Sequence, residues 1–221
     1  MTLVVAIDGP AGSGKSSVSK AVARQLGFGY LDTGAAYRSL AWACLQAGVD
    51  LTNSDDVASH IEQVASGRPL DPDSQHHVVG GVDITEDIRG SEVSAAVSSV
   101  AQHSEVRQAL NLGFRQLAED TELPGVIIEG RDITTVVAPD APVRILLTAD
   151  EATRIARRQA ESAGLDASTI SNRDRADSAV VNFMTAADGV TTIDTTDLSF
   201  DDTVQAVLEL ISQAGDQGAH P

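Results

Sequence analysis

The chain has 221 residues and a mass of 23.0 kDa, which suits one domain with insertions or two small ones. Its formal net charge of −17 opposes binding to nucleic acid and anionic membranes, and its apolar fraction of 42% is typical of a globular protein in water. No apolar run has the length of a membrane span, the first residues lack a signal-peptide pattern, and the single cysteine excludes an intramolecular disulfide, so we expect a cytoplasmic protein.

Apolar strands and helix-compatible segments alternate along the chain. The first half predicts a strand at 3–7, a helix at 16–26, a strand at 30–31 and helices at 34–48 and 54–65. Ser54 is expected to cap the last of these helices, because Asp55 and Asp56 then fall in its first turn. Residues 67–90 change character: Gly80 and Gly81 stand between two short β-prone pairs and predict a hairpin outside the main sheet.

The second half continues the alternation. It predicts helical residues at 91–119 with a break near 103–104, buried strands at 126–128 and 143–147, a mobile loop at 163–178 and a strand at 191–194. Ser199 and Asp202 form a capping box for the last helix. The expected core face of that helix is Phe200, Val204, Val207, Leu208 and Ile211. We therefore predict an α/β fold, a single domain over residues 1–221 with a parallel sheet flanked by helices.

A phosphate-binding loop follows the first predicted strand. The strand–GxxxxGK[ST]–helix order of a P-loop is met by Gly9, Pro10, Ala11, Gly12, Ser13, Gly14, Lys15 and Ser16, with Ser17 next to it. The glycines admit unusual backbone conformations and a close approach of the backbone to phosphate. The loop amides then converge on the phosphate oxygens, Lys15 adds charge, and the Ser16 hydroxyl is the expected magnesium ligand. The sequence therefore predicts a nucleoside triphosphate site.

The positive charges are few and concentrated. Lys15 and Lys20, the only lysines, belong to the predicted P-loop helix, and five of the thirteen arginines fall between residues 154 and 175. Guanidinium groups bind phosphate through paired hydrogen bonds, so this segment is a candidate for small phosphorylated anions. For any single arginine, however, a solvated helix face with ion pairs is the better explanation.

Three further segments accompany the P-loop. They are Asp32-Thr33-Gly34-Ala35-Ala36-Tyr37-Arg38, Glu129-Gly130-Arg131-Asp132 and Arg173-Asp174-Arg175-Ala176-Asp177-Ser178. Together with the P-loop they resemble the bacterial cytidylate kinase family, the nucleoside monophosphate kinases that phosphorylate CMP and dCMP. The similarity extends over most of the chain, including residues 82–89, 106–110 and 139–143.

The resemblance implies a P-loop kinase core, a nucleotide-binding insert within about 34–100, a mobile lid at about 158–178, and roles for matching residues. Acceptor phosphate would be held by Thr33, Arg38 and Arg131, and the base by Ser98, Arg107 and Asp132. Tyr37 and Gly130 would also belong to the substrate-binding residues. The lid would bring Arg157, Arg158, Arg173 and Asp177 to the sugar and phosphates, so that Lys15, Arg131 and the lid arginines act in catalysis. The family usually has an arginine three residues after the aspartate matched by Asp177, where this chain has Val180.

The implied reaction is phosphorylation of CMP and dCMP by ATP with Mg²⁺, in a monomer without nucleic-acid polymer or membrane partners. The acceptor phosphate is already ionised at neutral pH, so positioning and charge neutralisation suffice. Two alternatives stay open: another small P-loop kinase, for adenylate, shikimate or a pantothenate-type metabolite, and a nucleotide-dependent switch, for which the chain lacks an Asn-Lys-x-Asp-type guanine reader.

Overall fold

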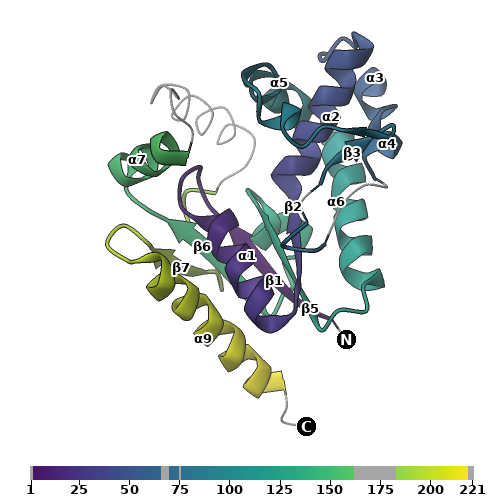
Figure 1. Cartoon of the computed structure of the whole chain (residues 1–221). Coiled ribbons are helices and arrows are strands. Elements are labelled where there is room, and N and C mark those ends of the chain that lie inside the picture. Colours follow the sequence, from purple (N-terminus) through teal and green to yellow (C-terminus); the bar gives the residue numbers. More distant parts are fainter. Residues whose placement is uncertain (1, 66–69, 75, 162–182, 219–221) are drawn as a thin grey trace. The chain divides into compact units, whose positions relative to one another are not determined.

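A sheet with the strand order β2-β5-β1-β6-β7 organises the fold (Figure 1). The computed structural model describes residues 2–65, 70–74, 76–161 and 183–218. The strands are β1 (Leu3–Asp8), β2 (Gly29–Asp32), β5 (Gly125–Gly130), β6 (Val143–Thr148) and β7 (Thr191–Asp194). β1 pairs in parallel with β5 and β6, and β6 pairs in parallel with β7, which confirms the predicted α/β fold with a parallel sheet flanked by helices.

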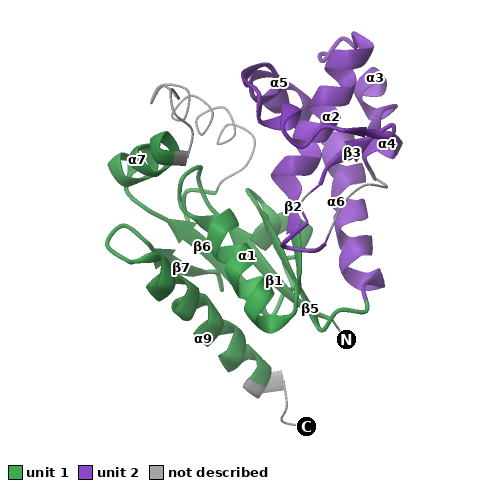
Figure 2. Cartoon of the chain, viewed as in Figure 1, with its two compact units in different colours: residues 1–30, 122–221 green, residues 31–121 purple. Residues whose placement is uncertain are grey.

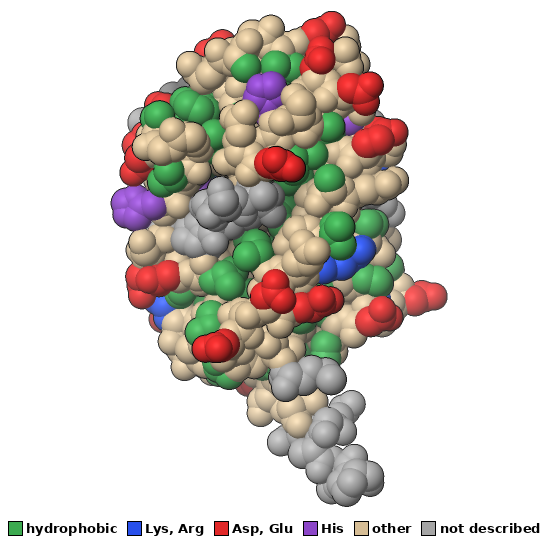
Figure 3. All heavy atoms as spheres, turned by 90° about the vertical axis from the view of Figure 1, so that its right-hand side faces the viewer, with side chains coloured by type: hydrophobic (Ala, Val, Ile, Leu, Met, Phe, Trp, Pro, Cys, Tyr) green, Lys and Arg blue, Asp and Glu red, His purple; other side chains and the backbone are tan. Residues whose placement is uncertain are grey.

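Two compact units divide the chain (Figure 2). Unit 1 comprises residues 1–30 and 122–221, and unit 2 comprises residues 31–121. The expectation of a single domain over residues 1–221 stays a prediction. On the face of the molecule in Figure 3, Asp and Glu side chains outnumber Lys and Arg side chains, in keeping with the net charge of −17.

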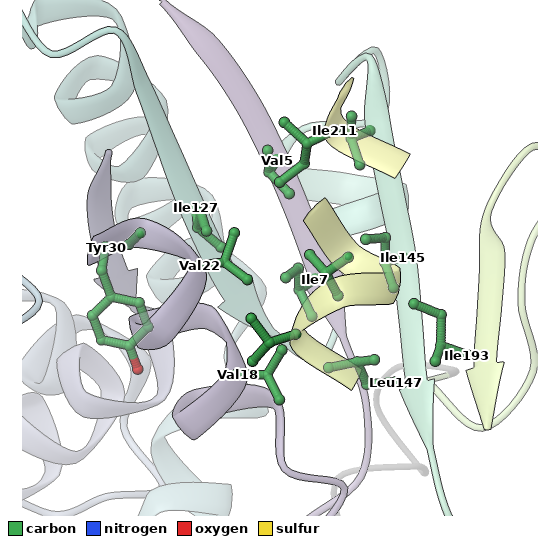
Figure 4. Close-up of a cluster of buried hydrophobic side chains, with 14 residues drawn as sticks. Val5, Ile7, Val18, Val22, Tyr30, Ile127, Ile145, Leu147, Ile193 and Ile211 are labelled. Carbon is green, nitrogen blue, oxygen red and sulfur yellow. The ribbon is translucent and has the colours of Figure 1, made fainter. Parts of the chain in front are cut away.

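The core of unit 1 lies between the sheet and two helices, α1 (Lys15–Leu26) and α9 (Phe200–Gly218). Side chains alternate along a strand, so every second residue of β1, β5 and β6 faces these helices. Figure 4 shows the resulting cluster, which includes Val5, Ile7, Val18, Val22, Ile127, Ile145, Leu147 and Ile211. This packing fixes the carboxyl end of β1, from which the P-loop leaves.

The last helix begins as the sequence predicts. The Ser199 hydroxyl accepts a hydrogen bond from the Asp202 amide at 3.1 Å, and the Asp202 carboxylate accepts one from the Ser199 amide at 3.3 Å. The predicted core face needs one correction. Val204, Val207 and Ile211 are buried, but Phe200 is 52% exposed, because it is the first residue of the helix and lies at the end of the packed face.

Unit 2 is mostly helical. It contains α2 (Thr33–Ala47), α3 (Ser54–Ala58), α4 (Ile61–Ala65), the 3₁₀ turn η1 (Asp87–Arg89), α5 (Ser91–Ala101) and α6 (Ser104–Asp120). Strands β3 (Val78–Val79) and β4 (Val82–Asp83) form a separate antiparallel hairpin around Gly80 and Gly81, as predicted. The predicted break between α5 and α6 is also present at Gln102–His103.

The predicted helix at 54–65 is wrong in two respects. Its cap is Asn53, whose side-chain oxygen accepts hydrogen bonds from the Asp55 and Asp56 amides at 3.1 and 3.4 Å. The helix also breaks after Ala58, where the Ser59 hydroxyl donates to the Asp56 carbonyl at 2.7 Å. A side chain that bonds to a carbonyl of the preceding turn competes with the helical backbone, which explains the division into α3 and α4.

Candidate active site

The P-loop joins β1 to α1 in unit 1 and has the conformation that its glycines predict. Gly12 and Gly14 have φ values of 78° and 87°, in the left-handed region that other residues rarely adopt. Gly9 is required for a different reason: a Cβ atom there would lie 2.2 Å from the Leu147 carbonyl oxygen. The loop therefore packs directly against the ends of its neighbours in the sheet.

Three carbonyl groups of the loop face polar side chains from other segments. The Gly9 carbonyl accepts a hydrogen bond from Arg131 Nη1 at 3.0 Å, and the Ala11 carbonyl accepts one from Arg154 Nη1 at 3.0 Å. The Thr195 hydroxyl lies within hydrogen-bonding distance of the Ser13 carbonyl, at 3.3 Å.

These contacts orient the loop amides. In a trans peptide the N–H points away from the C=O of the same peptide unit, and no peptide bond in the described chain is cis. The carbonyls of Ala11 and Ser13 share their peptide units with the amides of Gly12 and Gly14. Because the carbonyls point to Arg154 and Thr195, these two amides point to the opposite side, as an anion-binding loop requires.

Lys15 and Ser16 lie in the first turn of α1. The Lys15 side chain is half-buried and Ser16 is exposed, so the hydroxyl is accessible to a phosphate-bound cation. Among the described residues, no group of three or more His, Cys, Asp or Glu side chains is arranged to hold a metal ion. Magnesium usually keeps several waters and takes few protein ligands besides substrate phosphates, so a site built on Ser16 fits its chemistry.

Asp8, the last residue of β1, holds the turn that follows β5. Its Oδ1 accepts the Ile133 amide at 2.8 Å, and its Oδ2 accepts the Thr134 amide at 2.8 Å and the Thr134 hydroxyl at 2.6 Å. Asp8 is only 3% exposed. Burial raises the pKa of its carboxyl above the ordinary value, and the hydrogen bonds from Thr134 and Ile133 and the charge of Lys15 act in the opposite direction.

Gly130, Arg131 and Asp132 lead from β5 into η2 (Ile133–Val137), a single π-helical turn. The guanidinium of Arg131 stacks on the ring of Phe183 at 4.1 Å, in addition to its bond to Gly9. Cation–π stacking fixes the plane of a guanidinium and leaves its edges available for hydrogen bonds. The structure thus brings the predicted Arg131 beside the first residue of the P-loop.

The next-to-last residue of β5 is also buried and hydrogen-bonded. Glu129 is 1% exposed and accepts a hydrogen bond from the Tyr30 hydroxyl. The Tyr30 ring in turn lies under Lys20, whose Nζ is 5.2 Å from the ring centroid. The sequence alone indicates no role for this network.

The helix α7 (Glu151–Glu161) carries the other described arginines near the P-loop. Arg157 Nη1 donates to the Thr195 hydroxyl at 2.8 Å and its Nη2 to the Thr195 carbonyl at 2.7 Å, while Arg158 is half-buried in the last turn. Arg173, Asp177, Val180 and most of the predicted lid lie outside the described residues. The catalytic roles expected for Arg157 and Arg158 stay predictions.

In unit 2 the predicted acceptor residues of α2 lie together. Asp32 caps the helix by accepting the Ala35 amide at 2.8 Å, and it also pairs with Arg38 at 3.1 Å. Thr33 is buried in the first turn, at the helix N-terminus as expected. A Cβ at Gly34 would lie 3.2 Å from Arg38 Nη1, so the missing side chain makes room for the pair.

The remaining predicted residues of unit 2 lie on three helices. The Tyr37 ring on α2 is 6.4 Å from the Phe114 ring on α6, and Ser98 is half-buried on α5. Arg107 Nη1 donates to the Ala101 and Gln102 carbonyls at 2.9 and 3.0 Å, which satisfies orphan carbonyls at the end of α5. The base-reading roles of Ser98 and Arg107 stay predictions.

Three contributors to the site had no assigned role in the sequence analysis: Asp8, Phe183 and Thr195. Asp8 carries a detectable signal, since a charged residue at the end of a buried strand must find hydrogen-bond donors. Phe183 and Thr195 carry none, because their partners Arg131 and Ser13 are distant in sequence.

Comparisons with known proteins show the family of this chain. The sequence model of the family described as "Cytidylate kinase" matches residues 5–213. A cytidylate kinase of Cutibacterium acnes is 45% identical over 95% of this chain and 96% of its own length, and one of Mycobacterium avium is 42% identical over 96% of each. An uncharacterised protein of Eubacterium ventriosum with a solved structure shares the fold, with a TM-score of 0.53 and 14% identity over 96% of this chain and 99% of its own. No described helix is long and apolar enough to cross a bilayer. With the family match spanning nearly the whole sequence, this chain belongs to the cytidylate kinase family.

Proposed function

We propose that this chain transfers the γ-phosphoryl group of ATP to the 5′-phosphate of CMP and dCMP. An oxygen of the acceptor phosphate attacks the γ-phosphorus, the bond between that phosphorus and the β–γ bridging oxygen breaks, and ADP leaves with the bond electrons. The products are ADP and CDP or dCDP. Membership of the family and the curated relatives named cytidylate kinase support the reaction.

The observation that carries the proposal is the position of Arg131 at the entrance of the P-loop. Its Nη1 lies 3.0 Å from the Gly9 carbonyl, and Phe183 fixes the plane of its guanidinium. An arginine beside a loop that binds a triphosphate stabilises negative charge on phosphoryl groups in transit.

Residues of the P-loop bind and neutralise the donor. The Gly12 and Gly14 amides bind phosphate oxygens, and Lys15 supplies positive charge to the outer phosphates. Magnesium, held in part through the Ser16 hydroxyl, would neutralise charge on the β- and γ-phosphates when bound.

Residues of unit 2 and of the lid bind the acceptor and exclude water. Thr33, Arg38 and Arg131 hold the acceptor phosphate, and Ser98, Arg107 and Asp132 read the cytosine. Tyr37 and Gly130 also bind the substrate. Closure of the lid around 158–178 brings Arg157, Arg158, Arg173 and Asp177 to the nucleotides and prevents hydrolysis of ATP. We also propose that the chain acts as a cytoplasmic monomer without nucleic-acid or membrane partners, in keeping with its net charge of −17.

An acceptor panel tests the reaction. Purified protein is assayed with ATP and Mg²⁺ against CMP, dCMP, UMP, AMP and shikimate, and ADP release is measured together with the phosphorylated product. A parallel assay supplies GTP in place of ATP. We expect CMP and dCMP to give the highest kcat/KM. Faster phosphorylation of AMP, UMP or shikimate would refute the proposal, and so would GTP hydrolysis without a phosphorylated acceptor.

Paired arginine variants test the acceptor site. Arg38 and Arg89 both lie in unit 2 and both pair with a carboxylate, Asp32 at 3.1 Å and Glu86 at 3.8 Å. Arg38→Met removes a proposed phosphate contact and is expected to raise the KM for CMP at least about tenfold, with little change in the KM for ATP. Arg89→Met is the matched control and should leave both constants unchanged. Equal KM values for CMP in the two variants would exclude Arg38 from the acceptor site.

A further inference from the structure

Asp8 connects the backbone that enters the P-loop to the turn that carries Arg131. Its carboxylate accepts three hydrogen bonds from Ile133 and Thr134, at 2.8, 2.8 and 2.6 Å. Gly9, the next residue, accepts the bond from Arg131 at 3.0 Å. Gly9 therefore holds the first residue of the segment 131–134, and Asp8 holds its last two residues.

The chemistry at this position calls for a carboxylate. An ionised carboxylate is purely an acceptor, whereas an asparagine side chain presents one oxygen and one NH₂ group. With its oxygen in the place of Oδ2, asparagine keeps the two bonds from Thr134 but sets its NH₂ against the Ile133 amide. Burial raises the pKa of Asp8 because it disfavours the ionised carboxylate, and the three hydrogen bonds act against this effect.

A shift of this turn would be transmitted to Arg131. Ile133 is two residues from Arg131, and planar peptide units leave the short segment between them little freedom to absorb a displacement. The Arg131 guanidinium is further held between the Gly9 carbonyl and the Phe183 ring. The position of Arg131 relative to the P-loop thus depends on the hydrogen bonds that Asp8 accepts from Ile133 and Thr134, which we call the Asp8 tie.

We propose that Asp8 is a positioning residue for phosphoryl transfer, whose carboxylate fixes the Arg131–Thr134 turn on the P-loop entrance so that Arg131 and the donor loop act as one rigid element. The inference rests on the proposed function for its kinetic consequence. It assigns Asp8 no contact with either nucleotide: the carboxylate acts through the backbone of the turn.

Three variants separate this role from a general loss of stability. Asp8→Asn keeps the size of the side chain and disturbs the tie most. Thr134→Val removes only the hydroxyl donor and keeps both amide bonds, and Thr134→Ser retains a hydroxyl. Thr203→Val is the matched control, because Thr203 is also 3% exposed and donates its hydroxyl to a backbone carbonyl, that of Ser199 at 2.9 Å, within α9.

The kinetic readout is the change in the constants for the two nucleotides. We expect Asp8→Asn to lower kcat/KM for CMP by about 100-fold, since a displacement of about 1 Å at a reacting centre has an effect of this order. Thr134→Val should lower it by about tenfold, the equivalent of one hydrogen bond, and Thr134→Ser should restore most of it. The KM for ATP should stay within about twofold throughout, because the loop amides and Lys15 are unchanged.

Amide hydrogen exchange gives a readout that needs no activity. In Asp8→Asn the amides of Ile133 and Thr134 should exchange faster, while the Val18 amide, bonded to the Gly14 carbonyl at 3.0 Å, should keep its protection. If Asp8→Asn does not fold, Thr134→Val decides the question.

Two results would overturn the inference. One is a folded Asp8→Asn protein with the kcat/KM of Thr203→Val. The other is an equal rise of KM for ATP and CMP, which would mean that Asp8 acts on the donor loop itself through Lys15. Failure of the wild-type protein to phosphorylate CMP or dCMP would refute the proposed function instead, and the exchange measurement would still test the tie.

Discussion

Gly12 of the P-loop has no room for a side chain, because the backbone of α7 lies against it. A Cβ atom there would lie 2.5 Å from the carbonyl oxygen of Arg154, about 0.9 Å short of ordinary contact at 3.4 Å. The φ of 78° adds strain of about 1–2 kcal/mol for an L-residue. Arg154 cannot yield easily, because it is 6% exposed and donates to the Ala11 carbonyl at 3.0 Å.

Gly12→Ala should therefore move the loop, and the size of the movement sets the size of the effect. A shift of about 0.9 Å in the donor-binding backbone is expected to lower kcat/KM for ATP by about 100-fold. The free energy of unfolding should also fall by more than the strain alone. The assays are steady-state kinetics with ATP and CMP and denaturant unfolding of each variant.

Gly27→Ala is the matched control. Gly27 has a φ of 65° and ends α1, but an added Cβ there would meet nothing within 4 Å. This variant should lose about 1–2 kcal/mol of stability from backbone strain and keep its kinetic constants. If Gly12→Ala has the same kinetic constants and the same free energy of unfolding as Gly27→Ala, the collision with Arg154 does not affect catalysis and the reasoning is refuted.

Two further predictions concern unit 2. Leu110→Ala should lower the free energy of unfolding by about 2–5 kcal/mol, because Leu110 is fully buried on α6. Leu112 on the same helix is 54% exposed, so Leu112→Ala should change the free energy of unfolding by less than about 0.5 kcal/mol. Similar losses for the two variants in denaturant unfolding would contradict the burial of Leu110. Burial raises the pKa of Cys44 to about 11, so the thiol is protonated at pH 8. A thiol reagent should therefore modify the folded protein much more slowly than the unfolded protein. Equal rates of modification would contradict the burial of Cys44.

Local signals in the sequence predicted the elements well where donors and acceptors lie a few residues apart. The capping box of Ser199 and Asp202 is such a case, since both of its hydrogen bonds span three residues. The same rule fails at Asn53 and Ser54, because both residue types cap helices and only the backbone decides which one is used. Phe200 shows the limit of periodicity: helical spacing says which residues share a face, but not how far along the helix the core extends.

Contacts between distant segments could not be predicted in this way. The sequence shows that arginines gather between residues 154 and 175, and their charge made the segment a candidate for binding small phosphorylated anions. The structure shows that Arg154 and Arg157 donate to Ala11 and Thr195, which are 143 and 38 residues away. No spacing rule relates these positions, because the contacts depend on how α7 packs beside the P-loop.

The described arginines next to the loop act on backbone carbonyls, and this changes how their charge bears on phosphate binding. A guanidinium has five donors in a fixed plane, so a bond from one Nη to Gly9 or Ala11 uses only part of its capacity. At Ala11 the carbonyl faces Arg154 and the Gly12 amide of the same peptide unit faces away, so this contact orients a phosphate-binding amide. At Gly9 the peptide unit is completed by Pro10, which has no N–H, so the bond from Arg131 holds the guanidinium beside the loop but orients no amide. A lysine would supply the charge, but its ammonium group is not planar and could not lie flat on the Phe183 ring as the guanidinium of Arg131 does. The two kinds of cation are thus divided between two tasks: Lys15 lies on the helix that the P-loop opens, whereas Arg131 and Arg154 hold the carbonyls of the loop from outside.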